Sequence, residues 1–287
     1  MSNLSTLEPI DYLIIGHITQ DVTPQGFNLG GTASYSSLTA RSFGLRVGIV
    51  TACAADLVPK ELKGMAFSRK ASEHTSTFQN IYTPAGRIQH ILHVADSITL
   101  DDVPSAWLNT PIVHLGPLAG EIPPSMARAF PNSLTGVTPQ GWMRAWNGEN
   151  IVSYRPWQEA AEVLPHVQVC IMSIEDVCGD EDAVGHFASL VPILVVTEGM
   201  TGSRVYWHGD VRNFHAPSKE EVDPVGAGDI FAASFFIKYY QTKDPWEAAR
   251  FATLVGANSV TRAGIQGVPT AEEINTFTSE IIGYPAK

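Results

Sequence analysis

The sequence contains several short, continuous runs of apolar residues, each bounded by turn-forming residues. The runs are rich in Val and Ile and do not alternate with polar residues, which is typical of strands buried on both faces of a parallel sheet. Stretches with helical character, such as 32–43 and 180–190, separate some of them. Strands and helices that alternate in this way predict a doubly wound α/β fold. The predicted strands are 12–15, 47–50, 112–115, 167–172 and 193–196.

Two hairpins and a helical C-terminal third complete the predicted organisation. Residues 75–94 contain two β-prone runs around a Thr-Pro-Ala-Gly turn, which predicts a hairpin that interrupts the α/β rhythm as a flap. A second hairpin is predicted over 205–215. Because no internal repeat or flexible linker is visible, we expect a single domain over residues 1–287. The C-terminal helices are predicted over 229–240, 245–260 and 270–282.

The chain is acidic, with 18 basic and 29 acidic residues among 287 and a net charge of −11. Proteins that bind nucleic acid or anionic membranes neutralise phosphates with a basic surface, so this balance argues against both partners. The three cysteines form no CxxC pair, and the first residues lack the regions of a signal peptide. No run of 18 apolar residues is present. We therefore expect a cytoplasmic protein without a disulfide framework.

The sharpest local signal is the segment Asp223-Pro-Val-Gly-Ala-Gly-Asp229, which precedes an apolar helix. The first backbone N–H groups of a helix have no intrahelical partner, and with the helix dipole they form a site for an anion. The small residues Gly226, Ala227 and Gly228 allow a phosphate to approach them closely. Asp229 lies beside this site, where the dipole favours its ionised form, and it is our candidate for a catalytic base.

An alternative interpretation is structural: Asp229 caps a core helix and the glycines form a tight turn. The segment is not a P-loop, because no Gly-Lys-Ser/Thr follows, and it lacks the third glycine of a dinucleotide-binding fingerprint. The histidines do not indicate a metal site either. His90 and His93 are three residues apart in a predicted strand and therefore lie on opposite faces. His17 is either a substrate contact or a packed residue.

Four motifs in order resemble the PfkB, or ribokinase-like, family of small-molecule kinases. They are Gly16 to Asp21 followed by Gly30-Gly31, then Thr197-Glu-Gly199-Met-Thr-Gly202, then Asp223 to Asp229, and a tail Val-Thr-Arg-Ala-Gly at 260–264. The resemblance spans about 11–274. It implies a central, mostly parallel sheet flanked by helices, with a small β lid over the substrate. The lid elements would be roughly 17–29 and 75–96.

The resemblance also implies an activity and a set of roles. The chain would transfer phosphate from ATP, with Mg²⁺, to a hydroxyl of a small sugar or polyol, and a homodimer is left open. Asp229 would be the catalytic base, and Gly226, Ala227 and Gly228 the anion hole. Asp223 would neighbour a monovalent cation such as K⁺. The expected nucleotide-binding residues are Ser173, Thr197, Gly199, Gly202 and Asn258.

The chain departs from the family pattern at several positions. Tyr35 stands where ribokinases often carry Asn, Thr32 where some sugar kinases carry Lys, and Val225 where Thr is common. The family's Asn-x-x-Glu, which organises magnesium through water, is represented by a segment that begins at Ser173. Either Glu175 or Asp176 would take the acidic role.

The middle of the chain gives an indication of the substrate. Gln140 and Arg144 follow a predicted strand, and with the aromatic Tyr35 they are similar to the myo-inositol kinase branch of the family. A polyol requires donors and acceptors for several hydroxyls at once. A surface turn or a structural ion pair is the alternative for Gln140 and Arg144. A pentose kinase, a fructokinase, a nucleoside kinase and a non-catalytic ligand sensor remain as alternatives. The expected substrate-binding residues are Asp21, Gly30, Gly31, Tyr35, Gln140 and Arg144.

Overall fold

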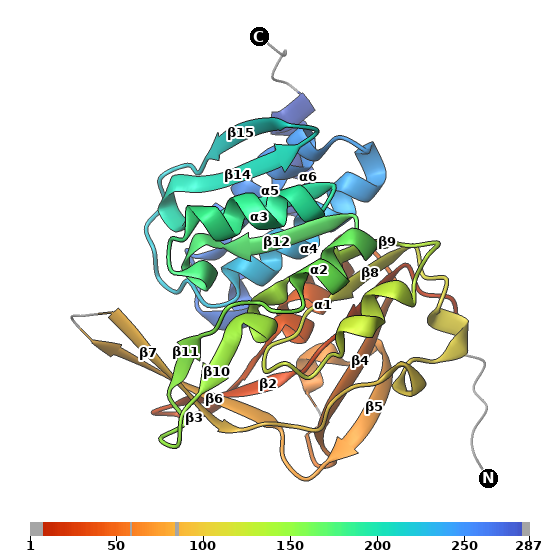
Figure 1. Ribbon diagram of the computed structural model, residues 1–287, viewed down its shortest axis with the longest axis vertical. Helices are drawn as coiled ribbons and strands as arrows, with labels where there is room; N and C mark the ends of the chain where they lie inside the picture. Colours follow the sequence, from red (N-terminus) through yellow and green to blue (C-terminus); the bar gives the residue numbers. More distant parts are fainter. Residues whose placement is uncertain (1–7, 58, 84–85, 283–287) are drawn as a thin grey trace.

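The apolar runs of the sequence form one large sheet (Figure 1). The computed structural model describes residues 8–57, 59–83 and 86–282. The strands of the sheet are β1 (Tyr12–Ile15), β4 (Val47–Ala54), β5 (Ala66–Ser72), β8 (Ile112–Leu115), β9 (Leu134–Val137), β12 (Val169–Ser173), β13 (Ile193–Thr197), β14 (Gly202–Trp207) and β15 (Asp210–His215).

In the described part of the chain these nine strands pair in the order β15-β14-β13-β12-β9-β8-β1-β4-β5. The pairs from β13 to β5 are parallel, whereas β14 and β15 add an antiparallel edge. The mostly parallel sheet predicted from the sequence is confirmed. In an open α/β sheet, ligands bind beyond the carboxyl ends of the parallel strands, so the site is sought there.

Helices cover both faces of the sheet, because alternate strand residues point to opposite sides. Leu13 and Ile15 belong to the apolar cluster under α2 and α3, and Tyr12 and Ile14 to the cluster under α1, α4 and α5. A further helix, α6, packs against α5. The bounds are α1 (Thr32–Ser42), α2 (Ala160–Val163), α3 (Glu181–Leu190), α4 (Ala227–Thr242), α5 (Pro245–Ser259) and α6 (Ala271–Ile282).

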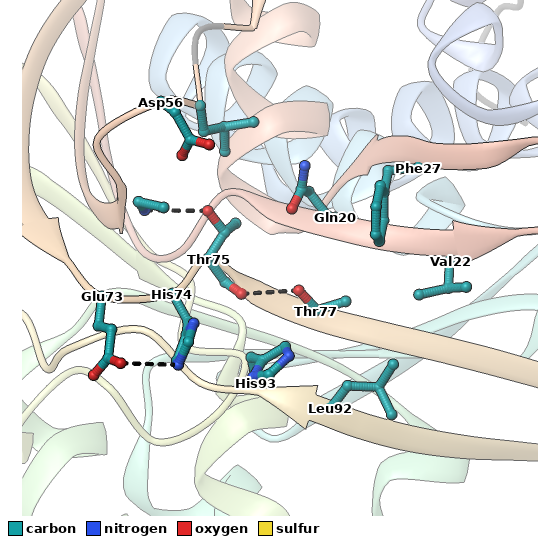
Figure 2. Close-up of a pocket in the computed structure, with 12 residues that line it drawn as sticks. Gln20, Val22, Phe27, Asp56, Glu73, His74, Thr75, Thr77, Leu92 and His93 are labelled. Carbon is teal, nitrogen blue, oxygen red and sulfur yellow. Dashed lines mark hydrogen bonds and ion pairs between the residues drawn. The ribbon is translucent and has the colours of Figure 1, made fainter.

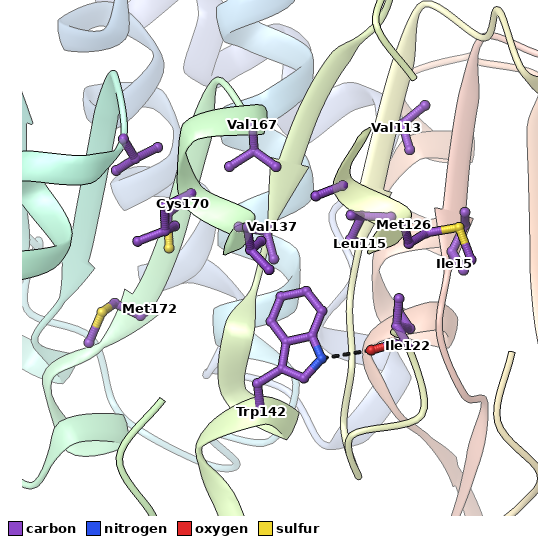
Figure 3. Close-up of a cluster of buried hydrophobic side chains, with 14 of the residues drawn as sticks. Ile15, Val113, Leu115, Ile122, Met126, Val137, Trp142, Val167, Cys170 and Met172 are labelled. Carbon is purple, nitrogen blue, oxygen red and sulfur yellow. Dashed lines mark hydrogen bonds between the residues drawn. The ribbon is translucent and has the colours of Figure 1, made fainter. Parts of the chain in front are cut away.

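Trp142 belongs to the core on the α2 and α3 side (Figure 3). Its indole N–H donates to the carbonyl of Ile122 at 2.8 Å, and its ring stacks on Trp157 with centroids 5.3 Å apart. A buried indole that satisfies its only donor in this way is a packing residue. The neighbouring segment 139–144, which carries Gln140 and Arg144, is therefore anchored to the core.

A second, smaller sheet leaves the large one after β1 (Figure 1). It consists of β2 (Thr19–Thr23), β3 (Gly26–Gly30), β6 (Ser76–Thr83) and β7 (Gly86–His93), in the order β3-β2-β6-β7. The predicted hairpin over 75–94 is β6 and β7. A short antiparallel pair, β10 (Arg144–Trp146) and β11 (Val152–Tyr154), lies beside β7. Among the described residues, no helix is long and apolar enough to cross a membrane.

Candidate active site

The start of α4 has the geometry of an anion site. Gly226 is the N-cap residue, with φ of 81°, a conformation that favours glycine. The N–H of Ala227 already donates to the carbonyl of Pro224 at 3.2 Å. Among the described residues, the N–H groups of Gly226, Gly228 and Asp229 make no backbone hydrogen bond outside the helix. Of the three residues expected in the anion hole, Gly226 and Gly228 therefore have the available donors.

Asp223 holds the loop that leads into this helix. Its two carboxylate oxygens accept the N–H groups of Val225, at 3.0 Å, and of Gly264, at 2.8 Å. The side chain thus joins the loop to the tail motif at 260–264. Because both oxygens accept these backbone donors, the structure gives Asp223 the role of a clamp. A monovalent cation beside it stays a prediction, and we derive no step through such an ion.

Asp229 lies in the first turn of α4 and is half-buried. Burial raises the pKa of its carboxyl group to about 6, while a hydrogen bond from Thr32 and the charge of Arg144 act in the opposite direction. Desolvation therefore outweighs the favourable effect of the helix dipole on the ionised form. At neutral pH the group is still mostly ionised and has the pKa of an effective general base.

The small sheet brings Asp21 close to Asp229. Asp21 lies on β2, and its negative charge contributes to the raised pKa of Asp229. The carboxylate also occupies the space beside Gly30, where a Cβ atom would lie 2.3 Å from an Asp21 oxygen. Gly31, with φ of 87°, is the N-cap residue of α1. The glycine pair therefore admits the Asp21 carboxylate and turns the chain from the small sheet into α1.

Gln140 and Arg144 reach the site from the segment 139–144. Gln140 donates to one oxygen of Asp176 at 3.2 Å, and the N–H of Ser173 donates to the other at 2.9 Å. Arg144 donates to the carbonyl of Leu118 at 3.3 Å. Its positive charge lowers the pKa of Asp176 and that of Asp229, so it lies near both carboxylates. Neither side chain belongs to a surface turn.

Tyr35 has a different position from the one expected. Its ring is 2% exposed and packs with Ile230 and Phe251. A Cβ atom on Gly226 would lie 2.3 Å from the ring, so the ring lies directly against the anion-hole loop. Burial, with the charges of nearby carboxylates including Asp21, raises the pKa of its hydroxyl group. Stacking of this ring on a substrate is therefore not what the structure shows, because the ring is enclosed by the core.

The residues expected to contact the nucleotide lie at the carboxyl ends of neighbouring strands. Ser173 ends β12 and is the register partner of Thr197, which ends β13. Gly199, with φ of 56°, and Gly202, with φ of 115°, form the turn into β14. Asn258 lies on α5, where its amide donates to Glu273 at 2.9 Å. Contact of these residues with a nucleotide stays a prediction.

Two acidic residues were candidates for organising magnesium, and the structure separates them. Asp176 is enclosed by Gln140 and Ser173, and burial raises its pKa. Glu175 is the more exposed of the two. Among the described residues, no group of three or more His, Cys, Asp or Glu side chains is arranged to hold a metal ion. Of the two carboxylates, Glu175 is therefore the one whose oxygens stay accessible to a cation's water shell, and a magnesium ion here stays a prediction.

Sequence reasoning missed one polar residue of the site, and one that holds the segment contacted by Arg144. Thr32 bonds the Asp229 carboxyl, and its position directly after the glycine pair was a usable signal. Glu121 is 2% exposed and accepts the N–H groups of His17, Leu118 and Ala119 at 2.8–3.1 Å. Its pattern of partners is not visible in the sequence. His17 is fully buried and bonds Ser76 and the Asp96 carbonyl, so it is a packed residue.

A cavity of about 580 Å³ lies on the face of the small sheet opposite to Asp21 (Figure 2). Gln20 and Val22, which alternate with Asp21 along β2, contribute to its wall, together with Phe27 and His93. None of the residues predicted for the site lines it. Strand β2 therefore separates this cavity from the carboxylates around Asp229.

The comparisons with known proteins agree with this geometry. Residues 157–271 match the pfkB family carbohydrate kinases. A cytidine kinase from Thermococcus kodakarensis is 26% identical, over 84% of this chain and 92% of the relative. A ribokinase from Haemophilus influenzae is 23% identical over 90% of each chain. An inositol 3-kinase from Oryza sativa is 25% identical, over 90% of this chain and 70% of the relative.

Solved structures extend the likeness over almost the whole chain. A variant of a pyrophosphate-dependent myo-inositol-1 kinase superposes with a TM-score of 0.76 at 20% identity, covering 94% of this chain and 99% of that one. Arabidopsis thaliana ribokinase, complexed with ribose and ATP, superposes with a TM-score of 0.73 at 17% identity, covering 97% of this chain and 100% of that one. The fold is thus that of the ribokinase class. Together with the sequence match over 157–271, these likenesses support a PfkB, or ribokinase-like, carbohydrate kinase, a phosphotransferase that acts on hydroxyl groups.

Proposed function

We propose that this chain transfers the γ-phosphoryl group of ATP to a hydroxyl group of a cyclic polyol, with myo-inositol as the favoured acceptor. The observation that carries the proposal is the position of Asp229, beside the N–H groups at the start of α4 and near both Asp21 and Arg144. Phosphoryl transfer needs a base, an anion site and groups that orient the acceptor within reach of one another.

In the proposed phosphoryl transfer, Asp229 acts as the base. Its carboxylate takes the proton of the acceptor hydroxyl while that oxygen attacks the γ-phosphorus. A new P–O bond forms, the bond from the γ-phosphorus to the bridging oxygen breaks, and ADP leaves. The N–H groups of Gly226 and Gly228 would donate to the oxygens of the transferred group, where negative charge must be stabilised. A carboxyl pKa of about 6 suits this proton transfer near neutral pH.

Magnesium, when bound with the donor, neutralises the charge of its phosphates. Glu175 is the accessible carboxylate that would hold its water shell, since the oxygens of Asp176 already accept Gln140 and Ser173. Asp176 would instead fix Gln140 and the end of β12. The nucleotide would lie along Thr197 and Gly199, at the carboxyl ends of the sheet strands.

The choice of acceptor is supported by Arg144 and Asp21. The planar guanidinium group of Arg144 can donate to two adjacent hydroxyls, and the Asp21 carboxylate can accept from others. Relatives named as inositol kinases among the similar sequences and structures support the same acceptor. Tyr35 does not contribute to this argument, because its ring is enclosed by the core. Sugars and nucleosides remain in the test, since a cytidine kinase and a ribokinase are similar over most of the chain.

The test is a panel of initial rates at equal acceptor concentration. Myo-inositol, ribose, fructose, adenosine and cytidine are each assayed with ATP and Mg²⁺, and pyrophosphate replaces ATP in a parallel series. We expect the highest kcat/KM with myo-inositol and ATP. A preference for ribose or a nucleoside contradicts the polyol assignment and leaves the kinase intact. No turnover in any arm, together with binding of one acceptor by calorimetry, would favour a ligand sensor.

A further inference from the structure

A second cavity, of about 370 Å³, lies between the edge strand β15 and helix α5. Its wall combines cationic and aromatic side chains, and none of the described residues that line it is acidic. This is unusual in a chain with a net charge of −11. None of the residues expected to bind the acceptor or the nucleotide belongs to it. The lining residues are Arg212, Asn213, Phe214, His215, Trp246, Arg250, Thr253 and Leu254.

The aromatic floor of this cavity is ordered by mutual contacts. The guanidinium of Arg212 lies over the indole of Trp246, 4.2 Å from the ring centroid. Trp246 also stacks with Phe214, with centroids 6.4 Å apart and planes inclined by 25°. Guanidinium groups on aromatic faces are held in place while their N–H edges stay available to a ligand. The cavity therefore presents an oriented cation beside an apolar surface.

The cationic rim has little internal compensation. Arg212 pairs with Asp210 at 3.3 Å, but both side chains are more than half exposed, so this pair contributes little. No ion pair or hydrogen bond joins the Arg250 guanidinium to any other residue that the structure describes. Two arginines line one cavity, one of them without a protein partner among the described residues, and a phosphate group accepts paired N–H donors from such forks.

We propose that this cavity is a second binding site, separate from the catalytic one, for a small phosphate-bearing molecule. Arg212 and Arg250 contact its phosphate, and Phe214 and Leu254 contact its apolar part. The coupling of this site to catalysis rests on the proposed function, because the cavity would adjoin the nucleotide site proposed around Gly199 and Gly202. His215 is the register partner of Gly202, and the Gly202 backbone packs so tightly on the Phe214 carbonyl that a Cβ atom would lie 1.9 Å from it. A ligand that moves β15 therefore alters the turn at Gly202, and with it the KM for the donor.

The experiment is isothermal calorimetry on the whole chain with AMP and with inorganic phosphate, each alone and after saturation with a non-hydrolysable ATP analogue. We expect AMP to bind with the analogue present, and Arg250→Gln to weaken it about tenfold or more, as expected for a lost charge-assisted hydrogen bond. Arg128→Gln, which removes an exposed arginine outside the cavity, is the matched control and should leave binding unchanged. Binding of inorganic phosphate alone would support the proposal, because it would show that the two arginines bind the phosphate group.

Three results would overturn the proposal. They are absence of AMP binding at millimolar concentration, equal affinity in the Arg250→Gln and Arg128→Gln variants, and loss of AMP binding once the analogue is bound. The last result would place AMP in the donor site instead. The predicted coupling has its own readout: AMP should change the KM for ATP in the wild type and in Arg128→Gln, but not in Arg250→Gln. An unchanged KM in the wild type overturns the coupling.

Discussion

The ring of Tyr35 lies directly beneath Gly226, so that a Cβ atom at position 226 would fall 2.3 Å from the ring. Gly226 has φ of 81°, which a residue with a side chain adopts at a cost of about 1–2 kcal/mol. Shape and backbone conformation therefore both require glycine at this position. The pair connects α1, which carries Tyr35, to the loop that begins α4 and presents Asp229.

This relationship predicts that the ring of Tyr35, and not its hydroxyl, serves the reaction. Among the residues that the structure describes, none hydrogen-bonds that hydroxyl, so Tyr35→Phe should keep kcat and the acceptor KM within about threefold. Tyr35→Leu removes the support of the loop and should lower kcat by about tenfold or more. Steady-state kinetics on both variants decide the matter. A Phe variant that raises only the acceptor KM would restore the substrate contact expected from the sequence.

Asp229→Asn tests the catalytic base. Loss of a general base costs about 10²–10⁴-fold in rate, so kcat should fall by that amount while binding of ATP is retained. The folded state holds this carboxyl at a pKa of about 6, above its ordinary value of 3.8. Ionisation is therefore less favourable in the folded chain, and the group lowers stability as the pH rises from about 4 to about 6. At pH 7 the Asn variant should unfold in urea no earlier than the wild type. A turnover near that of the wild type would exclude Asp229 as the base.

The pH profile provides an independent test of the same group. The base must be ionised, so kcat/KM should fall about tenfold per pH unit below a pH of about 6. Arg144 lowers the pKa of Asp229, so Arg144→Gln should move this acid limb to higher pH. Arg144→Lys retains the charge and should keep the limb, while acceptor turnover falls because the planar fork is lost. A limb that does not respond to Arg144→Gln would mean that another group titrates.

The fold was largely predictable because the parallel strands are buried on both faces. Runs such as Ile-Val-His-Leu at β8 are apolar enough to be recognised without a structure. Among the strands that were not predicted, β2, β3 and β5 differ from these runs in composition. Strand β5 reads Ala-Phe-Ser-Arg-Lys-Ala-Ser and is a half-exposed edge, and β2 and β3 carry Asp21, Asn28 and two glycines. An exposed strand needs no apolar run, so its signal is weak.

The site was predictable where a motif imposes backbone geometry. The glycines at 30, 31, 226 and 228 lie at helix starts, as their spacing indicated. The position of Tyr35 was not predictable, because a ring beside a substrate and a ring beneath a loop give the same sequence. The raised pKa of Asp229 was not predictable for a related reason: burial depends on what the whole chain packs around it. The cluster around Glu121 joins residues 17 and 118–121, which only the fold brings together.

Glu121 should contribute strongly to stability. Its carboxylate accepts three backbone N–H groups in a position that is 2% exposed. Glu121→Gln leaves an amide NH₂ facing one or more of these donors, and each buried unsatisfied group costs about 1–3 kcal/mol. We expect a loss of about 2–4 kcal/mol in the free energy of unfolding, measured by urea denaturation. The exposed Glu162→Gln provides the control and should change it by less than about 0.5 kcal/mol. Equal midpoints for the two variants would contradict the assignment.

The last prediction concerns Asp21, the acidic residue that the small sheet brings to the site. If its carboxylate accepts hydrogen bonds from hydroxyls of the acceptor, those buried hydroxyls lose a charged partner in Asp21→Asn. The variant should then raise the KM for the acceptor about tenfold or more and leave the KM for ATP within about twofold. The negative charge of Asp21 also raises the pKa of Asp229, so the same variant should move the acid limb of kcat/KM to lower pH, opposite to Arg144→Gln. Asp101→Asn, an exposed carboxylate outside the site, is the matched control and should change neither quantity. Equal increases in both KM values would remove Asp21 from the acceptor site, and a limb that stays in place would show that its charge does not reach Asp229.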